Sequence, residues 1–319
     1  MVSVNTQATK LITECMVKDL ERINCRATKW SNGATCIDCG VEVPGSLEAG
    51  LYMTSVCLGN LARLWITNEN YDSLILPTIH LAASHATIAT LGSQFAGWSM
   101  KLEKYYALGS GPARALSRVE KDLYAKIDYA DEANSAAIII EGDKIPPEGI
   151  ADLVAEKCGI STKNVYVLVA PTSSIAGSVQ ISGRIVEVGI HKLFHEEYDV
   201  KKVFSGSGAA PIAPVHPKSV KAMGRTNDAT IYAGTVNLTV NGGLGDNPQE
   251  LIDKIPSNSS KDYGRPFYDI FKEAEFDFYK IDAGMFAPAM ISVTDAESGK
   301  TYSAGKINLD ILKQSFGVK

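Results

Sequence analysis

The chain has 319 residues, of which 45% are hydrophobic and 21% are charged, and its formal net charge is −5. These proportions are ordinary for a globular protein, and the length is sufficient for one large or two medium hydrophobic cores. The basic residues are scattered without a dense Lys/Arg run, so the pattern that marks a nucleic-acid-binding surface is missing. We therefore expect small molecules or other proteins as partners, and no nucleic acid.

The N-terminal segment argues against an export signal, because residues 10–22 carry charged side chains where a signal peptide would need an apolar core. The six cysteines lack dense or regular spacing, which favours reduced thiols in a cytoplasmic protein. Cys36 and Cys39 form a C-x-x-C motif, but no second pair or histidine pair follows at zinc-ligand spacing. We expect burial of these thiols and no metal, with zinc binding and redox chemistry as the alternatives.

The predicted elements alternate irregularly along the chain. In chain order, the patterns predict a helix over 47–66, a strand over 135–142, a helix over 147–157, a strand over 164–170, a helix over 174–194, and strands over 229–240, 278–282 and 289–295. Residues 73–100 contain no Asp, Glu, Lys or Arg, yet their histidines, amide and hydroxyls favour protein interior or a cleft wall over a membrane span. Without a regular strand-helix repeat, the pattern predicts an α+β fold.

Two stretches rich in small residues and proline, 109–113 and 205–217, mark expected domain boundaries. We expect residues 111–224 to form one inserted α+β domain, and residues 1–110 with 225–319 to form a flanking α+β domain. A ligand cleft is expected between the two domains, with the 174–194 helix as one wall.

The predicted helix over 174–194 carries the most informative charges. Ser174 is suited to cap its start, and Arg184, Glu187 and His191 follow at spacings of three and four, which bring them to one face. A solvated surface ion pair is one interpretation. The turns before Arg184 are small and uncharged, which suits close approach of a ligand and keeps a functional site as the other interpretation.

Several long segments resemble one family. They are PTSSIAGSVQISGRIVEVGIHKL, ALGSGPARALSR, SQFAGW, PIAPVHP, NDATIYAG, SSKDYGRPFYDIF and DFYKIDAGMFAPA. Together they resemble the methenyltetrahydromethanopterin cyclohydrolase family, and the resemblance runs from the first predicted helix to the closing GKINLDILKQSFG. It implies a hydrolase that adds water to the cationic 5,10-methenyl form of a reduced pterin carrier and yields the 5-formyl form. It also implies a homotrimer, and a reaction without metal, nucleotide or other cofactor.

The resemblance extends to an R-x-x-E pair, Arg184 and Glu187. The methenyl carbon lies between two nitrogens of a cation and is already electrophilic, so the reaction needs a base that deprotonates water. A carboxylate can be that base and can also attract the cation, which makes Glu187 the expected catalytic group. Arg184 is expected to tune the carboxylate and to orient the water.

Other residues are candidates for contact with the pterin substrate. They are Ser93, Gln94, Trp98, Arg114, Ser174 and His216. An amide and a hydroxyl can recognise a pterin edge and an indole can stack on it, although core packing is the alternative for these residues. Arginine after a glycine-rich turn suits the acidic tail of the carrier.

Two rival functions remain at this point. The first is an acyl transferase that uses Cys57 or Ser174 as a nucleophile with a histidine, and the second is a non-catalytic pterin-binding subunit. The chain lacks a recognisable nucleophile elbow, and the Arg184/Glu187 pair argues against a purely binding role.

Overall fold

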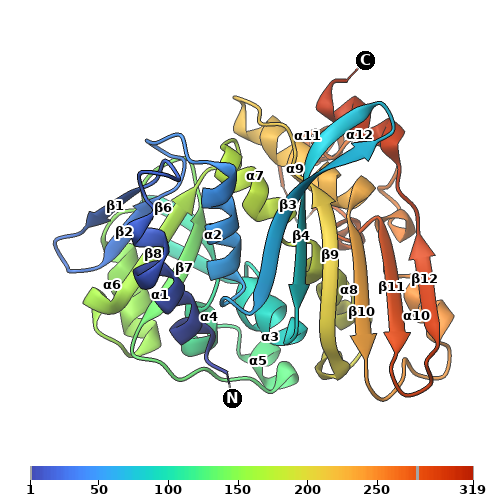
Figure 1. The fold of residues 1–319 in the computed structure, drawn as a ribbon, viewed down its shortest axis with the longest axis horizontal. Coiled ribbons are helices and arrows are strands. Elements are labelled where there is room, and N and C mark those ends of the chain that lie inside the picture. Colours follow the sequence, from blue (N-terminus) through green and yellow to red (C-terminus); the bar gives the residue numbers. More distant parts are fainter. Residues whose placement is uncertain (1, 278–279, 319) are drawn as a thin grey trace. The chain divides into compact units, whose positions relative to one another are not determined.

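The chain folds around two β-sheets. Figure 1 shows a computed structural model, which describes residues 2–277 and 280–318. Residue contacts divide the chain into two compact units: unit 1 comprises residues 1–63 and 88–180, and unit 2 comprises residues 64–87 and 181–319. Each sheet has six strands, includes both parallel and antiparallel neighbours, and is accompanied by helices. The predicted α+β class is confirmed, whereas the cleft between two domains stays a prediction.

Unit 1 contains the sheet with strand order β1-β2-β8-β7-β6-β5. Its strands are β1 (Arg26–Lys29), β2 (Thr35–Asp38), β5 (Trp98–Leu102), β6 (Tyr105–Ser110), β7 (Ala136–Glu141) and β8 (Val165–Ala170). Its helices are α1 (Val4–Glu14), η1 (Met16–Lys18), α2 (Leu47–Cys57), the π-helix η2 (Thr90–Gln94), α4 (Ala113–Ser117), α5 (Lys121–Ile127), α6 (Gly149–Cys158) and η3 (Thr162–Asn164). The chain crosses between the units three times, within β3 (Ala62–Tyr71), α3 (Ala86–Ala89) and α7 (Ile175–Ser182).

The central strand β7 of the unit 1 sheet is buried on both faces. Ile138 and Ile140 of β7 pack in one core with residues of α6, while Ile139 packs in a second core with residues of α1 and α2. Because β7 is covered on both sides, its sequence is a continuous apolar run rather than an alternating pattern. The strands predicted over 135–142 and 164–170 and the helix predicted over 147–157 are confirmed as β7, β8 and α6.

Unit 2 contains the sheet with strand order β12-β11-β10-β9-β4-β3. Its strands are β3 (Ala62–Tyr71), β4 (Leu74–Ala83), β9 (Val203–Pro211), β10 (Thr235–Val240), β11 (Met290–Asp295) and β12 (Thr301–Gly305). Its helices are α8 (Ile185–His195), η4 (Val200–Lys202), α9 (Ser219–Ala233), α10 (Pro248–Asp253), η5 (Ser257–Ser259), α11 (Phe267–Glu273), η7 (Ala283–Met285) and α12 (Leu309–Phe316).

The unit 2 sheet has one buried and one more open face. Along β10, Val236 and Leu238 are buried under α8, whereas the intervening Asn237 is exposed. This alternation is typical of a sheet that packs helices on one side only. The open side carries Trp65 at 43% exposure, stacked on the His80 ring at 5.4 Å between centroids.

The helix predicted over 47–66 is too long. It ends as α2 at Cys57, and residues 62–71 form the strand β3 instead. The physical reason lies in the turn that follows α2, where Gly59 and Asn60 adopt left-handed backbone conformations with φ of +64° and +53°. Such a pair stops a helix, because the backbone leaves the right-handed region.

Three predicted strands near the C-terminus have different outcomes. Residues 229–233 belong to the last turn of α9, so the strand predicted over 229–240 exists only from Thr235 onward, as β10. The strand predicted over 289–295 is confirmed as β11. Of the strand predicted over 278–282, residues 278 and 279 lie outside the described residues, and residues 280–282 are not in a strand.

The two compact units do not divide the chain at the two stretches rich in small residues, where domain boundaries were expected. The expected boundary at 110/111 falls inside unit 1, and the one at 224/225 falls inside α9 of unit 2. Residues 205–211 are not a linker, because they lie in β9, between β10 and β4 in the sheet. Small residues in this strand serve close packing against a helix, as described below.

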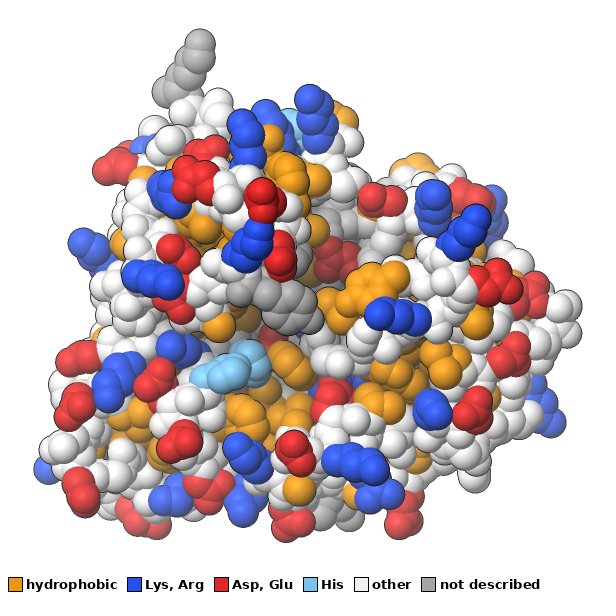
Figure 2. Space-filling view, turned by 180° about the vertical axis from the view of Figure 1, so that it is seen from behind, with side chains coloured by type: hydrophobic (Ala, Val, Ile, Leu, Met, Phe, Trp, Pro, Cys, Tyr) orange, Lys and Arg blue, Asp and Glu red, His pale blue; other side chains and the backbone are white. Residues whose placement is uncertain are grey.

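The charge-free segment over 73–100 is spread over β4, α3, η2 and the start of β5. Every residue of η2 is buried, which supports the interior interpretation of this part. In the part of the chain that the structure describes, no helix is long and apolar enough to cross a membrane. On the face shown in Figure 2, basic and acidic side chains are interspersed rather than gathered into a single field.

A buried carboxylate ties three helices of unit 2 together. Asp228 on α9 is fully buried and accepts hydrogen bonds from the Phe267 backbone N–H at the start of α11 (2.9 Å) and from Ser315 Oγ on α12 (2.5 Å). Burial raises the pKa of Asp228 to about 7, although these two hydrogen bonds oppose the increase. The group therefore retains its proton in the folded state at pH values where the unfolded chain has lost it.

This difference predicts a pH dependence of stability. The contribution of protonated Asp228 is fully present below about pH 4, the unfolded pKa, and is lost as the pH rises through about 7. We expect the free energy of unfolding, measured with urea, to fall between pH 5 and pH 8 by more in the unmodified protein than in Asp228→Asn. The difference should be a few kcal/mol, at most about 4. Equal pH dependence of the two proteins would contradict this assignment.

Candidate active site

The segment 174–194 forms two helices rather than the single predicted one. α7 ends at Ser182 and α8 starts at Ile185, with Arg184 as the residue that precedes its first turn. Ser182 and Gly183 form a small-residue pair, and Ser182 Oγ donates to the Pro211 carbonyl (2.9 Å), so the side chain is bonded outside the helix. Such a pair is a common cause of a break. The unit boundary at 180/181 lies close to this break.

Glu187 lies in the first turn of α8. It is buried, with 5% exposure, whereas Arg184 one turn earlier is half-buried. The N-terminal end of a helix carries partial positive charge, which stabilises a carboxylate placed there. The three residues predicted to share one helix face therefore differ in burial: Glu187 is buried, while Arg184 and His191 are half-buried.

Small residues in β9 let α8 lie close to the sheet. A Cβ added at Gly208 would lie 3.0 Å from Cγ2 of Ile185 and of Val186, and one added at Gly206 would lie 2.9 Å from Val186 Cγ1. These distances are shorter than ordinary van der Waals contact, so larger residues at either position would push α8 away. The spacing of α8 from the sheet thus sets the position of Glu187.

The far end of α8 carries a histidine pair. The His191 and His195 rings meet edge to face, with centroids 4.5 Å apart, and Lys192 pairs with Glu196 at 3.0 Å. His191 follows Glu187 by one helical turn. The remaining histidines, His80, His85 and His216, belong to unit 2 as well.

Ser93 and Gln94 belong to a buried polar cluster in unit 1. Ser93 Oγ donates to the Cys57 carbonyl (2.7 Å), and Cys57 Sγ lies 3.8 Å from the Gln94 carbonyl oxygen. Cys57 Sγ also lies 3.4 Å from Ser110 Oγ and 3.8 Å from Gln180 Nε2. Both predicted residues lie in the π-helix η2, a type of helix found frequently at functional sites.

Arg114 holds this π-helix in place. Its guanidinium is fully buried and donates through Nη1 to the carbonyls of Leu91 (3.3 Å) and Ser93 (2.9 Å). Nε and Nη2 lie 2.7 and 2.6 Å from Glu120 Oε1, and the guanidinium carbon lies 5.1 Å from the Phe95 ring centre. These contacts favour a structural role for Arg114 within unit 1.

Trp98 and Ser174 also have identifiable partners inside unit 1. Trp98, at 5% exposure, packs in the core between the sheet and α6, which favours the core-packing interpretation. Ser174 Oγ accepts from the Gly177 N–H (3.0 Å) and donates to the Pro171 carbonyl (2.8 Å). Its predicted capping role, at the start of α7, is therefore confirmed.

The cysteines of the C-x-x-C motif are poorly suited to nucleophilic or metal chemistry. Cys36 and Cys39 are buried, and burial followed by the charges of Asp38 and Glu42 raises the pKa of Cys36 to about 12. A hydrogen bond with Cys25 and burial raise the pKa of Cys39 as well. Both conditions disfavour the thiolate that binds metal or attacks carbon. Within residues 2–277 and 280–318, no group of three His, Cys, Asp or Glu could hold a metal ion.

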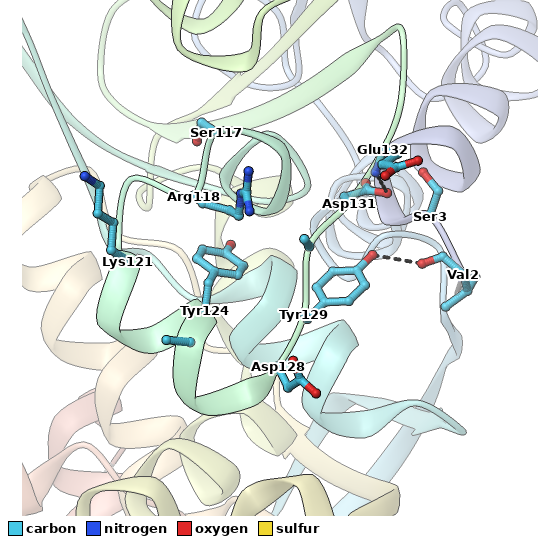
Figure 3. Close-up of a pocket in the computed structure, with 12 residues that line it drawn as sticks. Val2, Ser3, Ser117, Arg118, Lys121, Tyr124, Asp128, Tyr129, Asp131 and Glu132 are labelled. Carbon is cyan, nitrogen blue, oxygen red and sulfur yellow. Dashed lines mark hydrogen bonds between the residues drawn. The ribbon is translucent and has the colours of Figure 1, made fainter.

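Unit 1 also contains a cavity of about 910 Å³ that the sequence did not predict. Figure 3 shows Arg118 and Lys121 on one side of this cavity and Asp131 and Glu132 on the other. Arg118 ends α4 in the left-handed conformation, with φ of 49°, which is rare outside glycine. The lining contains none of the predicted catalytic or substrate-binding residues.

His216 lines a different cavity, in unit 2, together with Lys221 and Arg225. His216 was predicted as a site residue from the sequence without its two basic neighbours. The missed signal is the spacing of Lys221 and Arg225, because residues four apart share a helix face.

Comparisons with known proteins show the family to which this chain belongs. Residues 3–316 match the family model described as cyclohydrolase (MCH). Methenyltetrahydromethanopterin cyclohydrolase from Methanococcoides burtonii is 47% identical, covering 100% of this chain and 99% of the relative. The enzyme of the same name from Methanothermobacter thermautotrophicus is 46% identical, and the match covers 100% of this chain and 100% of the relative. The one from Methanococcus maripaludis is 48% identical, and the match covers 99% of this chain and 98% of the relative.

The chain is therefore a hydrolase of the cyclohydrolase type. It belongs to the methenyltetrahydromethanopterin cyclohydrolase family, as its sequence motifs indicated. The match covers both structural units, so neither unit is an addition to the family's architecture.

The close packing of α8 makes a testable prediction. We expect Gly208→Ala to lower the free energy of unfolding by about 1–3 kcal/mol, because its Cβ would crowd Ile185, Val186 and the Thr235 carbonyl. Gly142→Ala is the matched control, since the nearest atom to its Cβ lies 3.7 Å away. Urea denaturation of both variants measures the difference. Equal losses of stability would show that β9 does not constrain α8.

Proposed function

We propose that this chain interconverts 5,10-methenyltetrahydromethanopterin plus water and 5-formyltetrahydromethanopterin. The observation that carries the proposal is the family match over residues 3–316, with relatives of that name at 46–48% identity over nearly their whole length. A buried carboxylate in the first turn of α8, at the family-like R-x-x-E, supports it with a group suited to the reaction.

The reaction needs one proton transfer at the step that forms the new bond. The water oxygen attacks the methenyl carbon, which accepts the electron pair because it carries the positive charge of an amidinium-like cation. One proton leaves the water to the base, and the bond from this carbon to one of its two nitrogens breaks. That nitrogen takes up the second water proton, the other nitrogen keeps the formyl group, and one proton is released overall.

We assign the base to Glu187. Its burial strengthens electrostatic attraction to a cation, since charges interact more strongly in a medium of low polarisability than in water. Its position on a helix packed against a sheet restricts its movement, which suits a group that must meet water at hydrogen-bond distance. Arg184, half-buried one turn earlier, is assigned the roles of orienting the water and tuning the carboxylate.

The substrate contacts are part of the same proposal. Ser93 and Gln94, on a buried π-helix, are the groups that we assign to the pterin edge. Arg114, Trp98 and Ser174 stay predicted substrate contacts, and their own contacts hold this helix, the unit 1 core and the start of α7. His216 is treated separately below. The homotrimer and a cytoplasmic location also stay predictions.

The direct test is to incubate the protein with the methenyl substrate and follow its long-wavelength absorbance. Turnover predicts loss of this absorbance, whereas a pterin-binding subunit would bind without it. An acyl transferase would instead form a covalent intermediate that an acylating probe could trap.

Glu187→Gln should lower kcat by at least about 10², because an amide keeps the size of the side chain but cannot accept the proton. Some increase in KM is expected as well, since the amide no longer attracts the cation. Glu196→Gln, at the other end of α8, is the matched control and should keep near-normal kcat. If Glu187→Gln keeps near-normal kcat while remaining folded, Glu187 is not the base.

Arg184→Ala should move the rising limb of the pH–rate profile to higher pH. A carboxylate that loses a neighbouring positive charge gives up its proton less readily. Lys192→Ala removes a positive charge from the same helix further from Glu187 and should leave the limb in place. A shift to lower pH would contradict the tuning role.

Activity should also survive exhaustive chelation without added metal or nucleotide, because the substrate is activated by its own charge. The rate before and after treatment with a chelator tests this. Loss of turnover that zinc restores would overturn the expectation and direct attention to Cys36 and Cys39.

A further inference from the structure

The cavity around His216 has an unusual concentration of basic groups. Its volume is about 320 Å³, and its lining includes His216, Lys221 and Arg225 from the loop after β9 and the first half of α9. The lining also includes Tyr268 and Asp269 of α11 and Ser315 of α12. The space is near the lower end of the range for small-molecule sites and is ample for a phosphate-sized group.

Arg225 makes this cavity rigid. Nη1 donates to the carbonyls of Pro214 (3.3 Å) and Val215 (3.2 Å), and Nη2 donates to the carbonyl of Phe316 (3.0 Å). The side chain thus fastens the loop that carries His216 to the end of α12. Partial burial lowers the pKa of Arg225, but a guanidinium remains charged throughout the physiological range.

The positive charges in the cavity are poorly compensated. Lys221 lies one helical turn before Arg225, and like charges at this spacing repel. Lys221 lies over the Tyr268 ring, 5.5 Å from its centre, and Arg225 donates to backbone carbonyls rather than to a carboxylate. Asp269 also lines the cavity and is exposed, so its single charge offsets the positive charges only in part, and the buried Asp228 is bonded to Ser315. An anion in the cavity would offset the repulsion.

His216 adds a third group to this set. Its Nδ1 accepts a hydrogen bond from the Lys218 backbone N–H (3.0 Å), so in the neutral ring Nε2 carries the proton and is a donor. Partial burial and then the charges of Arg225 and Lys221 lower the pKa of His216 below its usual range. The same positive field that disfavours a proton on the ring favours a bound anion.

We propose that His216, Lys221 and Arg225 form a binding site for a compact multivalent oxyanion, such as a phosphate group or closely spaced carboxylates. The site lies wholly within unit 2 and is independent of the reaction assigned to Glu187. Arg225 acts chiefly as a positioning residue that presents a fixed charge. Lys221 and His216 contact the anion directly.

The binding should depend on pH. Anion binding stabilises the protonated imidazole, so the affinity rises as the pH falls through the titration of His216, and the bound anion raises the pKa of that ring. Besides Lys221 and Arg225, the charged groups near the ring are Lys218 on its own loop and Asp269 on α11. Asp228, which is bonded to the lining residue Ser315, also titrates near neutral pH. The Asp228→Asn variant separates its titration from that of His216.

The test is imidazole NMR of the labelled protein titrated with inorganic phosphate, at constant ionic strength set with sodium chloride. The chain has five histidines, and loss of a signal in His216→Asn assigns the relevant one. We expect a saturable shift of the His216 signals and a higher pKa of this ring in the presence of phosphate. Lys221→Ala should weaken phosphate binding by about fivefold or more, since it removes a charged donor.

Lys218→Ala is the matched control, because this exposed lysine lies three residues before Lys221 but does not line the cavity. It should change the affinity less than about twofold. A parallel titration with citrate distinguishes a phosphate site from a carboxylate site. The proposal is overturned if neither anion gives a saturable shift, if chloride alone reproduces it, or if Lys221→Ala binds as tightly as the unmodified protein. Each result is obtained without measuring turnover, so the assignment of the reaction does not affect it.

Discussion

The close contact between α8 and β9 is the constraint on which the candidate site depends. A buried carboxylate is costly unless its surroundings compensate it, and Glu187 is compensated in part by its place in the first turn of a helix. Because Gly206 and Gly208 leave no side chain beneath Ile185 and Val186, the helix end lies directly on the sheet. The charge is thereby held on rigid elements, which is the arrangement that electrostatic stabilisation of a cationic reaction requires.

Local signals predicted the parts of the fold in which one pattern dominates. The strand β7 was predictable from its sequence, because a strand that is covered on both faces has an unbroken apolar run. The stretch 205–217 was predicted as a domain boundary because glycine and proline are common at boundaries, whereas its first residues lie in β9. Sequence alone does not reveal a helix packed above a strand. The helix over 174–194 was predicted as continuous because its apolar stripe crosses Gly183 without a change of period.

The site was predictable to the extent that the resemblance covered it. Arg184 and Glu187 were found by spacing and motif, but α8, which carries Glu187, packs on the strands β9 and β10, about 20 to 50 residues further along the chain. Arg114 was expected to meet an anion because arginine after a glycine-rich turn commonly does, whereas tertiary contacts with Glu120 and the π-helix carbonyls engage it. The basic cavity was missed because His216 was considered without the helix face that follows it.

The most direct test of the central claim is chemical rescue of Glu187→Ala. If Glu187 activates water, removing its carboxylate leaves a space in which a small carboxylate can act as the base. The account predicts that turnover, lost in Glu187→Ala, is partly restored by added formate in a concentration-dependent manner, and that Glu196→Ala with formate shows no such increase. Near-normal turnover of Glu187→Ala without formate would contradict the account and place the water-activating group elsewhere.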